Sequence, residues 1–165
     1  MLIPKTLDPE EECIRCVLHP LMYSQSKRKL KREAFLPPPG DNKVSLLRLA
    51  YTEGGLTFCI NHGKSLLIPK HTFVGLASIT PNMVEECSDD VLKTNSFCVE
   101  IVFAPMHQGR YINTTLDIDT AVSNIDLPMH ADLVYAIIEQ GEVQTTLRKF
   151  AHELSKKAKF ILAEE

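Results

Sequence analysis

The sequence predicts an α+β fold with a mixed or mostly antiparallel sheet and a C-terminal amphipathic helix packed on it. Several short apolar runs have the length of strands, and one long segment near the end repeats its apolar residues at helical spacing. The composition, with 44% hydrophobic and 24% charged residues, is typical of a soluble globular domain. We therefore expect a single compact domain over residues 1–165.

Two strands are expected in the first third of the chain. The segment ECIRCVLH (12–19) is rich in Val, Ile and Cys and is stopped by Pro20. The segment KVSLLRLAY (43–51) is the second strand candidate. Between them we expect one helical turn within residues 20–33, followed by an extended connector over 34–42, because three successive prolines there fix φ and remove backbone donors.

The middle of the chain predicts a hairpin or meander and a further strand. EGG at 53–55 indicates a turn, and LTFCI (56–60) leads toward a second turn at NHG (61–63). The segment HTFVGLASI (71–79) is typical of an extended strand.

A helix is then expected to begin at Thr80, which can cap it, with Pro81 in its first turn, and to run to about Cys87. SFCVEIVFAP (96–105) alternates well enough to be a strand. Residues 106–127 show little periodicity, so a long polar loop is expected there.

The segment DLPMHADLVY (126–135) is interpreted as a loop that enters a strand near His130. The last element has the clearest pattern, with a polar stripe beside its apolar face and lysines that suit the negative end of a helix dipole. Its apolar residues are Val143, Leu147, Phe150, Ala151, Leu154, Ala158 and Ile161.

The class of protein is bounded by what the sequence lacks. The first residues do not have the charged start and apolar stretch of a signal peptide, and no run of about 18 apolar residues occurs. We therefore expect a cytoplasmic protein that does not enter a membrane. HGKS (62–65) has the end of a phosphate-binding loop, but Phe58 occupies the position of its first glycine. The signatures of α/β hydrolases, dinucleotide-binding proteins and zinc proteases are absent, and no cofactor is predicted.

Five scattered cysteines favour reduced thiols over a disulfide framework. Cys13-x-x-Cys16 and Cys59-x-x-His62 have the ligand count of a structural zinc site. Cys13 and Cys16, however, are three apart in an expected strand and would point to opposite faces. Buried thiols without a metal are therefore the favoured interpretation.

Charge is unevenly distributed along the chain. The formal net charge is −3, yet residues 1–52 carry nine Lys/Arg against six Asp/Glu. Most of this positive excess comes from one run that could bind a polyanion or simply form a solvated surface. The run consists of Lys27, Arg28, Lys29, Lys31 and Arg32.

Five segments together resemble a group of small bacterial proteins. The segments are RCVLHP, AFLPPP, VSLLR, LPMHADLVY and LRKFAHELSKKAKF. The group has the pattern R-x-[IV]-H-P, F-x-P, [LV]-S-[VL]-x-R and P-x-H-A followed by a basic terminal helix, and no activity is assigned to it. The chain departs from this pattern at Leu18 and at 126–127. The resemblance implies a set of functional positions and an association with bacterial conflict or phage-defence systems. The positions are His19, Ser45, Arg48, His130 and Arg148.

Three functions are compatible with these features. The first is a non-enzymatic interaction or accessory protein that holds a protein partner through the basic run or the terminal helix. The second is a small nucleotide- or NAD-handling enzyme with His19, Arg48 and His130 as catalytic residues. In that enzyme the ligand-binding residues would be Ser45, Asp132 and Arg148. The third is nucleic-acid binding through residues 27–32. A structural role for His130, with Asp132 as a pairing carboxylate, is the alternative to all three at that position.

Overall fold

The computed structural model describes residues 2–91, 97–112, 118–119, 124–137 and 143–163. Its main feature is a six-stranded antiparallel sheet in the order β12-β6-β2-β5-β11-β7. Its strands are β2 (Cys13–His19), β5 (Lys43–Arg48), β6 (Thr72–Ile79), β7 (Phe97–Phe103), β11 (His130–Ile137) and β12 (Lys159–Leu162). The helices are α1 (Gly55–Ser65), α2 (Pro81–Val91) and α3 (Val143–Lys157).

Short strand pairs and turns complete the described chain. β1 (Leu2–Ile3) pairs with β10 (Ile118–Asp119), β3 (Tyr23–Ser24) with β4 (Lys29–Leu30), and β8 (Met106–His107) with β9 (Arg110–Tyr111). Two 3₁₀ turns flank β5, and they are η1 (Arg32–Phe35) and η2 (Leu49–Tyr51). No helix in the described part of the chain is long and apolar enough to cross a membrane.

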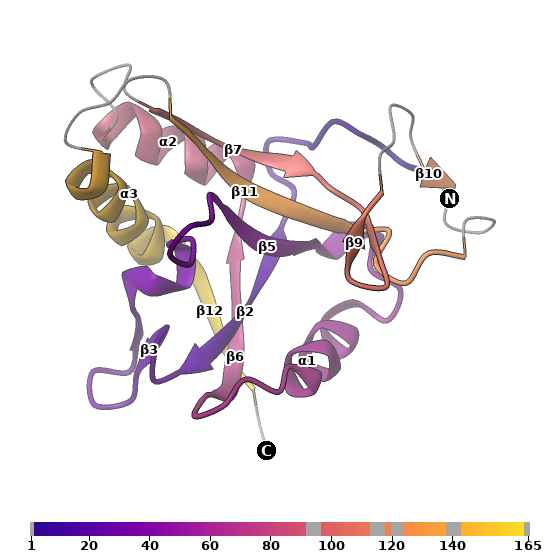
Figure 1. Ribbon diagram of the computed structural model, residues 1–165, viewed down its shortest axis with the longest axis horizontal. Helices are drawn as coiled ribbons and strands as arrows, with labels where there is room; N and C mark the ends of the chain where they lie inside the picture. The colour runs from indigo at the N-terminus through magenta and orange to yellow at the C-terminus, as the bar shows by residue number, and fades with distance from the viewer. Residues whose placement is uncertain (1, 92–96, 113–117, 120–123, 138–142, 164–165) are drawn as a thin grey trace.

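The sheet divides between β2 and β5. Within the described residues these strands pair only at Cys13↔Arg48 and Ile14↔Leu47, after which β2 continues along β6 and β5 continues along β11. In Figure 1, β5, β11 and β7 run across the view, whereas β2 and β6 run up and down it. Arg15 spans the division, because its Nε donates to Ala34 O at 3.0 Å and its Nη1 to Ser45 O at 3.4 Å.

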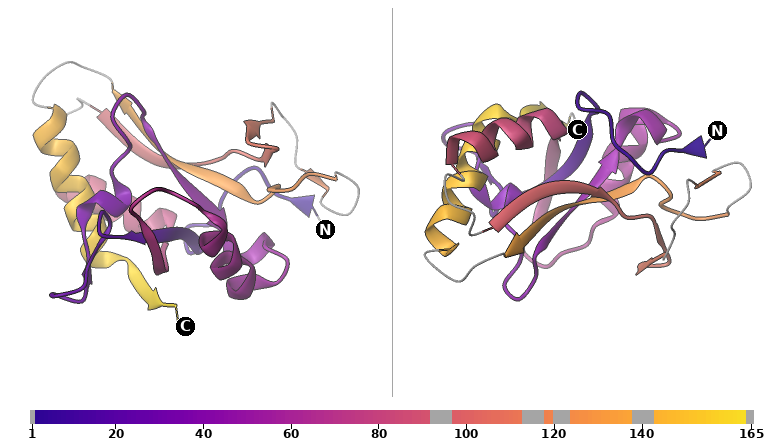
Figure 2. Two further views of the ribbon diagram at one scale, coloured as in Figure 1. Left: turned by 60° about the horizontal axis from the view of Figure 1, so that its bottom comes forward. Right: turned by 90° about the horizontal axis from the view of Figure 1, so that it is seen from above.

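One face of the sheet is covered by α2, α3 and η1, which enclose the larger hydrophobic core. Figure 2 (right) shows α2 and α3 on the same side of β7 and β11. Tyr135 is central to this face, since its hydroxyl donates to Phe35 O and its ring meets Phe150 edge-on at 5.8 Å. All three side chains are buried, so they fix η1 and α3 against β11.

The opposite face carries a smaller core beneath α1, which contributes the buried Cys59. Gly63 lets the helix approach β6, because a Cβ at that position would lie 2.3 Å from the ring of Phe73. Ile14, Leu47 and Leu76 from the sheet pack against this helix or beside it. The β5 and β11 part of this face extends beyond α1 toward β8 and β9.

The predicted α+β class and the mostly antiparallel sheet are confirmed. The strands expected within 12–19, 43–51, 71–79 and 96–105 are observed as β2, β5, β6 and β7, whose bounds differ from the expected ones by at most three residues. Thr80 caps α2 as expected, since its Oγ1 accepts from the backbone N–H of Met83 at 3.1 Å.

Four local predictions are wrong. Residues 56–60 lie in helix α1 and not in a hairpin, because a short apolar run fits a buried helix as well as a strand. Residues 20–33 form the β3–β4 hairpin and the start of η1 instead of one helical turn. The terminal helix ends at Lys157, so that Ile161 belongs to β12. Within 106–127, the described residues include β8, β9 and β10.

Candidate functional site

The basic run predicted from the sequence is carried by the β3–β4 hairpin. Tyr23 pairs with Leu30, and both side chains are buried, so the residues between them are held out toward solvent. The turn is tight: the backbone N–H of Lys27 donates to Ser24 Oγ at 3.3 Å, and Arg28 adopts a positive φ of 50°. This geometry places the cations on both sides of one short loop.

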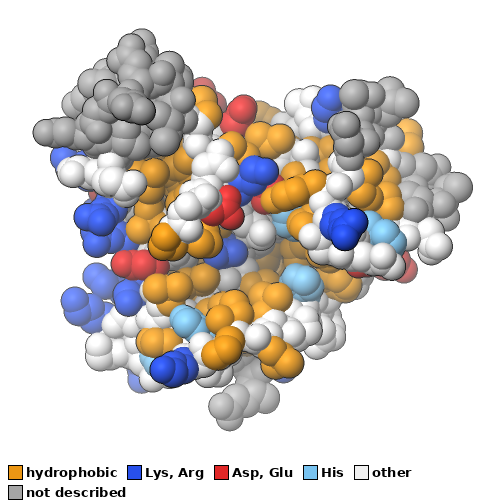
Figure 3. Space-filling view, viewed as in Figure 1, with side chains coloured by type: hydrophobic (Ala, Val, Ile, Leu, Met, Phe, Trp, Pro, Cys, Tyr) orange, Lys and Arg blue, Asp and Glu red, His pale blue; other side chains and the backbone are white. Residues whose placement is uncertain are grey.

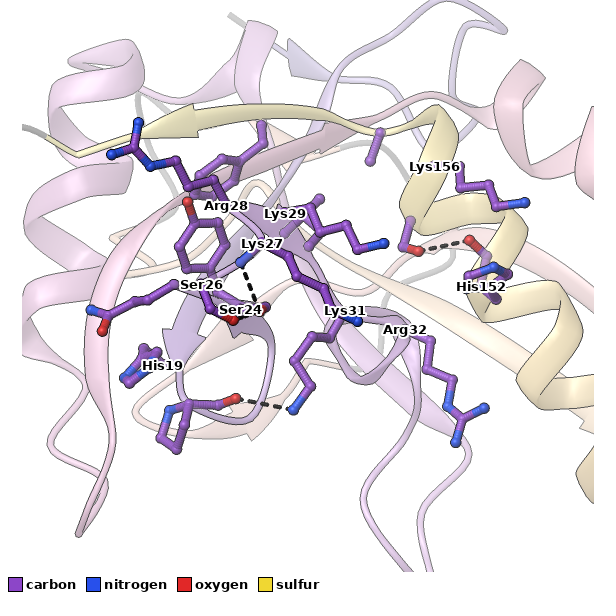
Figure 4. Close-up of a pocket in the computed structure, with 17 residues that line it drawn as sticks. His19, Ser24, Ser26, Lys27, Arg28, Lys29, Lys31, Arg32, His152 and Lys156 are labelled. Atoms are coloured by element: carbon purple, nitrogen blue, oxygen red, sulfur yellow. Dashed lines mark hydrogen bonds between the residues drawn. The ribbon is translucent and has the colours of Figure 1, made fainter.

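The hairpin forms one wall of a cleft of about 710 Å³. The opposite wall comes from α3 and β12, with His152, Ser155 and Lys156 at the end of the helix and Phe160 beyond it. Figure 4 shows His152 and Lys156 across the cleft from the hairpin, with Arg28 and Arg32 at its two ends. We call this the cationic cleft. Its charged and titratable lining residues are His19, Lys27, Arg28, Lys29, Lys31, Arg32, His152 and Lys156.

The cationic cleft is strongly positive in a chain that is otherwise acidic. Six of the 18 Lys/Arg line the cleft, and no Asp or Glu does. The rest of the chain therefore carries twelve Lys/Arg and all 21 Asp/Glu, which is a net charge of −9 outside the cleft. Lys31 Nζ donates to Pro20 O at 3.2 Å, and Arg32 and Lys156 have partly exposed acidic neighbours, Glu33 and Glu153, at 3.6 and 3.1 Å. Figure 3 shows Lys and Arg side chains gathered along the side of the molecule that holds α3 and the hairpin.

A second cluster lies on the other face of the sheet, at His130 and Asp132 of β11. Strand alternation places both side chains on one face, and Ser45 is the cross-strand partner of Asp132. The two side chains are 4% and 3% exposed, and His130 Nε2 lies 4.0 Å from Asp132 Oδ1. His130 Nδ1 is 2.8 Å from Ala104 O. Because a carbonyl oxygen can only accept, Nδ1 carries the proton, and in a neutral ring Nε2 is an acceptor.

Burial determines the charge states of this pair. It lowers the pKa of His130, although the Asp132 carboxylate partly offsets the effect. It raises the pKa of Asp132, against hydrogen bonding from Tyr111 and the charges of His130 and Lys43. Among the described buried side-chain polar atoms, Asp132 Oδ1 alone has no hydrogen-bond partner.

A cleft of about 270 Å³ adjoins His130, where β2 and β5 diverge. Most of its walls are apolar, and its polar lining residues are Arg15, Ser45, His62 and His130. Burial also lowers the pKa of His62, so its ring favours the neutral form. We call this the β2–β5 cleft. Its apolar lining includes Ile14, Leu46, Leu47, Leu66, Met106 and Leu127.

The residues proposed for catalysis do not meet. His19 lines the cationic cleft, whereas His130 lines the β2–β5 cleft. Arg48 pairs with Cys13 at the opposite end of β2 from His19, which separates the two by about 20 Å at the rise of a strand. The arrangement expected for a nucleotide- or NAD-handling enzyme is therefore not formed.

Arg48 is fully buried, and each of its three guanidinium nitrogens donates a hydrogen bond. Its Nε and Nη2 donate to the two carboxylate oxygens of Glu11 at 2.5 and 2.8 Å, and its Nη1 donates to Pro4 O at 2.5 Å. The guanidinium also lies over the rings of Tyr51 and Phe103. The guanidinium has no exposed surface and each of its nitrogens already donates a hydrogen bond within the protein, so Arg48 is a structural residue.

Of the three expected ligand-binding residues, Ser45 and Asp132 lie together beside His130. Arg148 is exposed on α3, and α3 packs on the opposite face of the sheet. The sequence pointed to His62 of α1 only as a possible zinc ligand and did not point to Tyr111 of β9. Neither His152 nor Lys156 was assigned to a site, although their spacing of four places them on one side of the predicted helix.

The cysteines do not form a metal centre. Cys13 and Cys16 belong to the cores on opposite faces of the sheet, and Cys16 Sγ donates to Cys59 O at 3.8 Å. Burial raises the pKa of Cys13 to about 12 and those of Cys16 and Cys59 to about 11, so the thiols stay protonated. In the part of the chain that the structure describes, no three His, Cys, Asp or Glu side chains are grouped to hold a metal ion.

Comparison of the chain with protein-family models, with curated proteins and with solved structures found no match.

Proposed function

We propose that the protein is a non-enzymatic binding module that holds an acidic segment of a partner protein in the cationic cleft. The observation that carries the proposal is the composition of the cleft wall, which has six Lys/Arg side chains and no carboxylate in a chain of net charge −3. Such a concentration of one sign of charge attracts and orients a partner of the opposite sign.

The partner is a protein segment in this proposal and not a nucleic acid. The aromatic residues of the cleft, Tyr23 and Phe160, stack on each other at 4.9 Å and Tyr23 is buried, so the ring faces that meet are not available to stack on bases. A duplex or a long single strand would also extend beyond the cleft over the rest of the molecule, which has a net charge of −9. A short acidic segment would avoid that repulsion.

Binding of a fluorescein-labelled oligoglutamate, followed by fluorescence anisotropy, tests the proposal. The double variant Lys27→Glu/Lys29→Glu is expected to weaken binding by about tenfold or more, because each change removes an attraction and adds a repulsion. Its matched control, Lys64→Glu/Lys70→Glu, makes the same charge change at exposed residues outside the cleft and is expected to bind nearly as the wild type does. Affinity should fall as salt is raised.

Equal losses in both double variants would mean that only net charge matters, and would overturn the proposal. Tighter binding of a single-stranded DNA oligonucleotide than of the oligoglutamate would overturn it in favour of nucleic-acid binding. Failure of the wild type to bind the oligoglutamate at low salt would also count against it.

A further inference from the structure

The β2–β5 cleft opens at the division of the sheet, and a cation spans that division. Residues 14–16 of β2 and 45–47 of β5 all line the cleft, so it reaches into the gap between the two strands and not only over one face of them. Arg15 crosses this gap from β2, because its Nη1 donates to Ser45 O on β5 at 3.4 Å. Its guanidinium therefore lies where the strands that line the cleft separate.

The charge of Arg15 has no counterion in the described part of the chain. None of the ion pairs between described residues includes Arg15. Burial lowers the pKa of Arg15, and the one group that opposes this effect is the Cys16 thiol. The pKa of Cys16 is itself raised to about 11, so the thiol carries no charge near neutral pH. A half-buried cation is thus left without an anion beside it, which is costly in a largely apolar place.

One nitrogen of the Arg15 guanidinium is also free to donate. Nε donates to Ala34 O at 3.0 Å and Nη1 to Ser45 O, whereas no hydrogen bond between described residues uses Nη2. Nη2 is not among the described buried polar atoms that lack a partner, so it keeps accessible surface. Arg15 differs in this from Arg48, whose guanidinium nitrogens all donate and which has no exposed surface.

Two further hydrogen-bond donors belong to the lining of the cleft. Ser45 is exposed on β5, and its hydroxyl makes no hydrogen bond to another described residue. The His62 ring from α1 likewise has no hydrogen bond within the described residues. Because burial lowers its pKa, this ring favours the neutral form, which has one N–H to donate. The lining therefore combines one cation with two neutral donors, and it contains no Asp or Glu.

The geometry points to a binding site for a small monocarboxylate with an apolar body, held in the β2–β5 cleft with its carboxylate against Arg15 Nη2 and its body along the aliphatic walls. The site shares no lining residue with the cationic cleft, so the inference does not rest on the proposed function.

The donors and the single charge of the lining determine the head group. A carboxylate accepts hydrogen bonds through two oxygens, and its bond to a guanidinium is charge-assisted. Arg15 balances one negative charge, whereas the second charge of a phosphate monoester would remain uncompensated among apolar side chains. An ammonium group has only donors and would be repelled by Arg15. His130 Nε2 is an acceptor on β11, so the carboxylate belongs at the β2 side of the cleft.

The cleft walls set the size and character of the rest of the ligand. At about 270 Å³ the cleft lies at the small end for ligand sites. Aliphatic side chains from β2, β5 and α1 supply most of its lining. A carboxylate on a short alkyl or aromatic body fits these dimensions.

Three probes with one body and different heads test the site: hexanoate, 1-hexanol and hexylamine. Titration of the isotope-labelled wild-type protein, followed by NMR, is expected to give the tightest binding for hexanoate, with shifts at the Arg15 side chain and the His62 ring, and no binding for hexylamine. Arg15→Gln is expected to weaken hexanoate binding by about tenfold or more while leaving hexanol binding nearly unchanged, because it removes the charge and keeps the apolar walls.

Two further variants keep the test decisive if Arg15→Gln does not fold, as judged by circular dichroism. Ser45→Ala changes an exposed side chain and removes one donor, so it is expected to weaken hexanoate by about threefold or more and hexanol much less. Leu127→Phe narrows the cleft without removing a donor and is expected to weaken both hexanoate and hexanol.

The cationic cleft needs its own control, because hexanoate is an anion. Lys27→Glu/Lys29→Glu is expected to leave hexanoate binding nearly unchanged, since neither lysine lines the β2–β5 cleft. A loss in this double variant as large as that in Arg15→Gln or Ser45→Ala would overturn the inference. Equal binding of hexanoate and hexanol to the wild type, or no binding of hexanoate, would also overturn it, the latter by showing that solvent alone satisfies Arg15.

Discussion

Arg48 and Asp132 are both buried charged side chains on neighbouring strands, yet they differ in how their charges are paired. Arg48 donates hydrogen bonds to both oxygens of Glu11 and to Pro4 O, and aromatic rings lie against it. Asp132 has one oxygen without a partner and faces another acceptor. A buried charge that is fully paired maintains the fold, whereas one left partly unpaired is a candidate for binding something else.

The largest change in stability is expected at the buried, paired charge of Arg48. Glu11→Ala leaves the guanidinium of Arg48 buried without its carboxylate, which should lower the free energy of unfolding by about 3–5 kcal/mol. Urea denaturation measures this change. Glu33→Ala is the matched control, because Glu33 pairs with Arg32 at the surface, and it should cost less than about 1 kcal/mol. Equal losses in the two variants would remove the distinction between buried and exposed pairs.

A smaller change in stability, of the opposite sign, is expected at Asp132, which has one oxygen without a partner. Asp132→Asn removes an unpaired buried anion, keeps an acceptor for Tyr111, and supplies an N–H that can point toward His130. We expect the free energy of unfolding to rise by about 1 kcal/mol at neutral pH. A loss as large as that of Glu11→Ala in the same urea experiment would show that the carboxylate is structural, and the comparison would fail.

The stabilisation by Asp132→Asn should depend on pH. Because burial raises the pKa of Asp132 above its ordinary value of 3.8, the protonated side chain stabilises the fold fully below that ordinary value, and this contribution is lost as pH rises through the raised pKa. The variant should therefore exceed the wild type most at neutral pH, and the difference should shrink in acid. Urea midpoints of both proteins across this pH range measure it. A difference that is constant with pH would mean that Asp132 does not titrate as buried.

The smallest effect concerns the imidazole. The Asp132 carboxylate raises the pKa of His130 against the larger effect of burial, so Asp132→Asn should make the His130 ring titrate at lower pH than in the wild type. NMR titration of the ring protons measures both values. The other titratable groups nearby, His62, Tyr111, Lys43 and Asp41, are unchanged in the variant. An unchanged His130 titration would show that the two side chains do not interact.

The fold was more accessible from the sequence than the sites were. Strand β6 and the start of α2 could be predicted because Thr80 and Pro81 give local signals that do not depend on the rest of the chain. Helix α1 could not, since the short run LTFCI fits either a strand or a buried helix, and the close approach of Gly63 to Phe73 is a tertiary contact.

Within the sites, local spacing was informative and distant pairing was not. The i, i+2 spacing of His130 and Asp132 places them on one face of a strand, and the basic run was visible as it stood. The role of Arg48 depends on Glu11, which is 37 residues earlier, and no local pattern marks it. The interaction of Tyr111 on β9 with Asp132 also joins distant residues, so no local pattern marks it. His19 and Arg48 do not meet because Arg48 pairs with the start of β2 and His19 lies at its end.

The division of the sheet between β2 and β5 also bears on how the chain folds during synthesis. β12, β6 and β2 form one half and β5, β11 and β7 the other, but the chain crosses from one half to the other after β2, β5, β6 and β11. Neither half is a continuous segment. The half containing β11 lacks a strand until Ile137 has been made, and the other half until Leu162. With so many contacts distant in sequence, neither half is complete until most of these residues have been made, and we expect folding to be correspondingly slow.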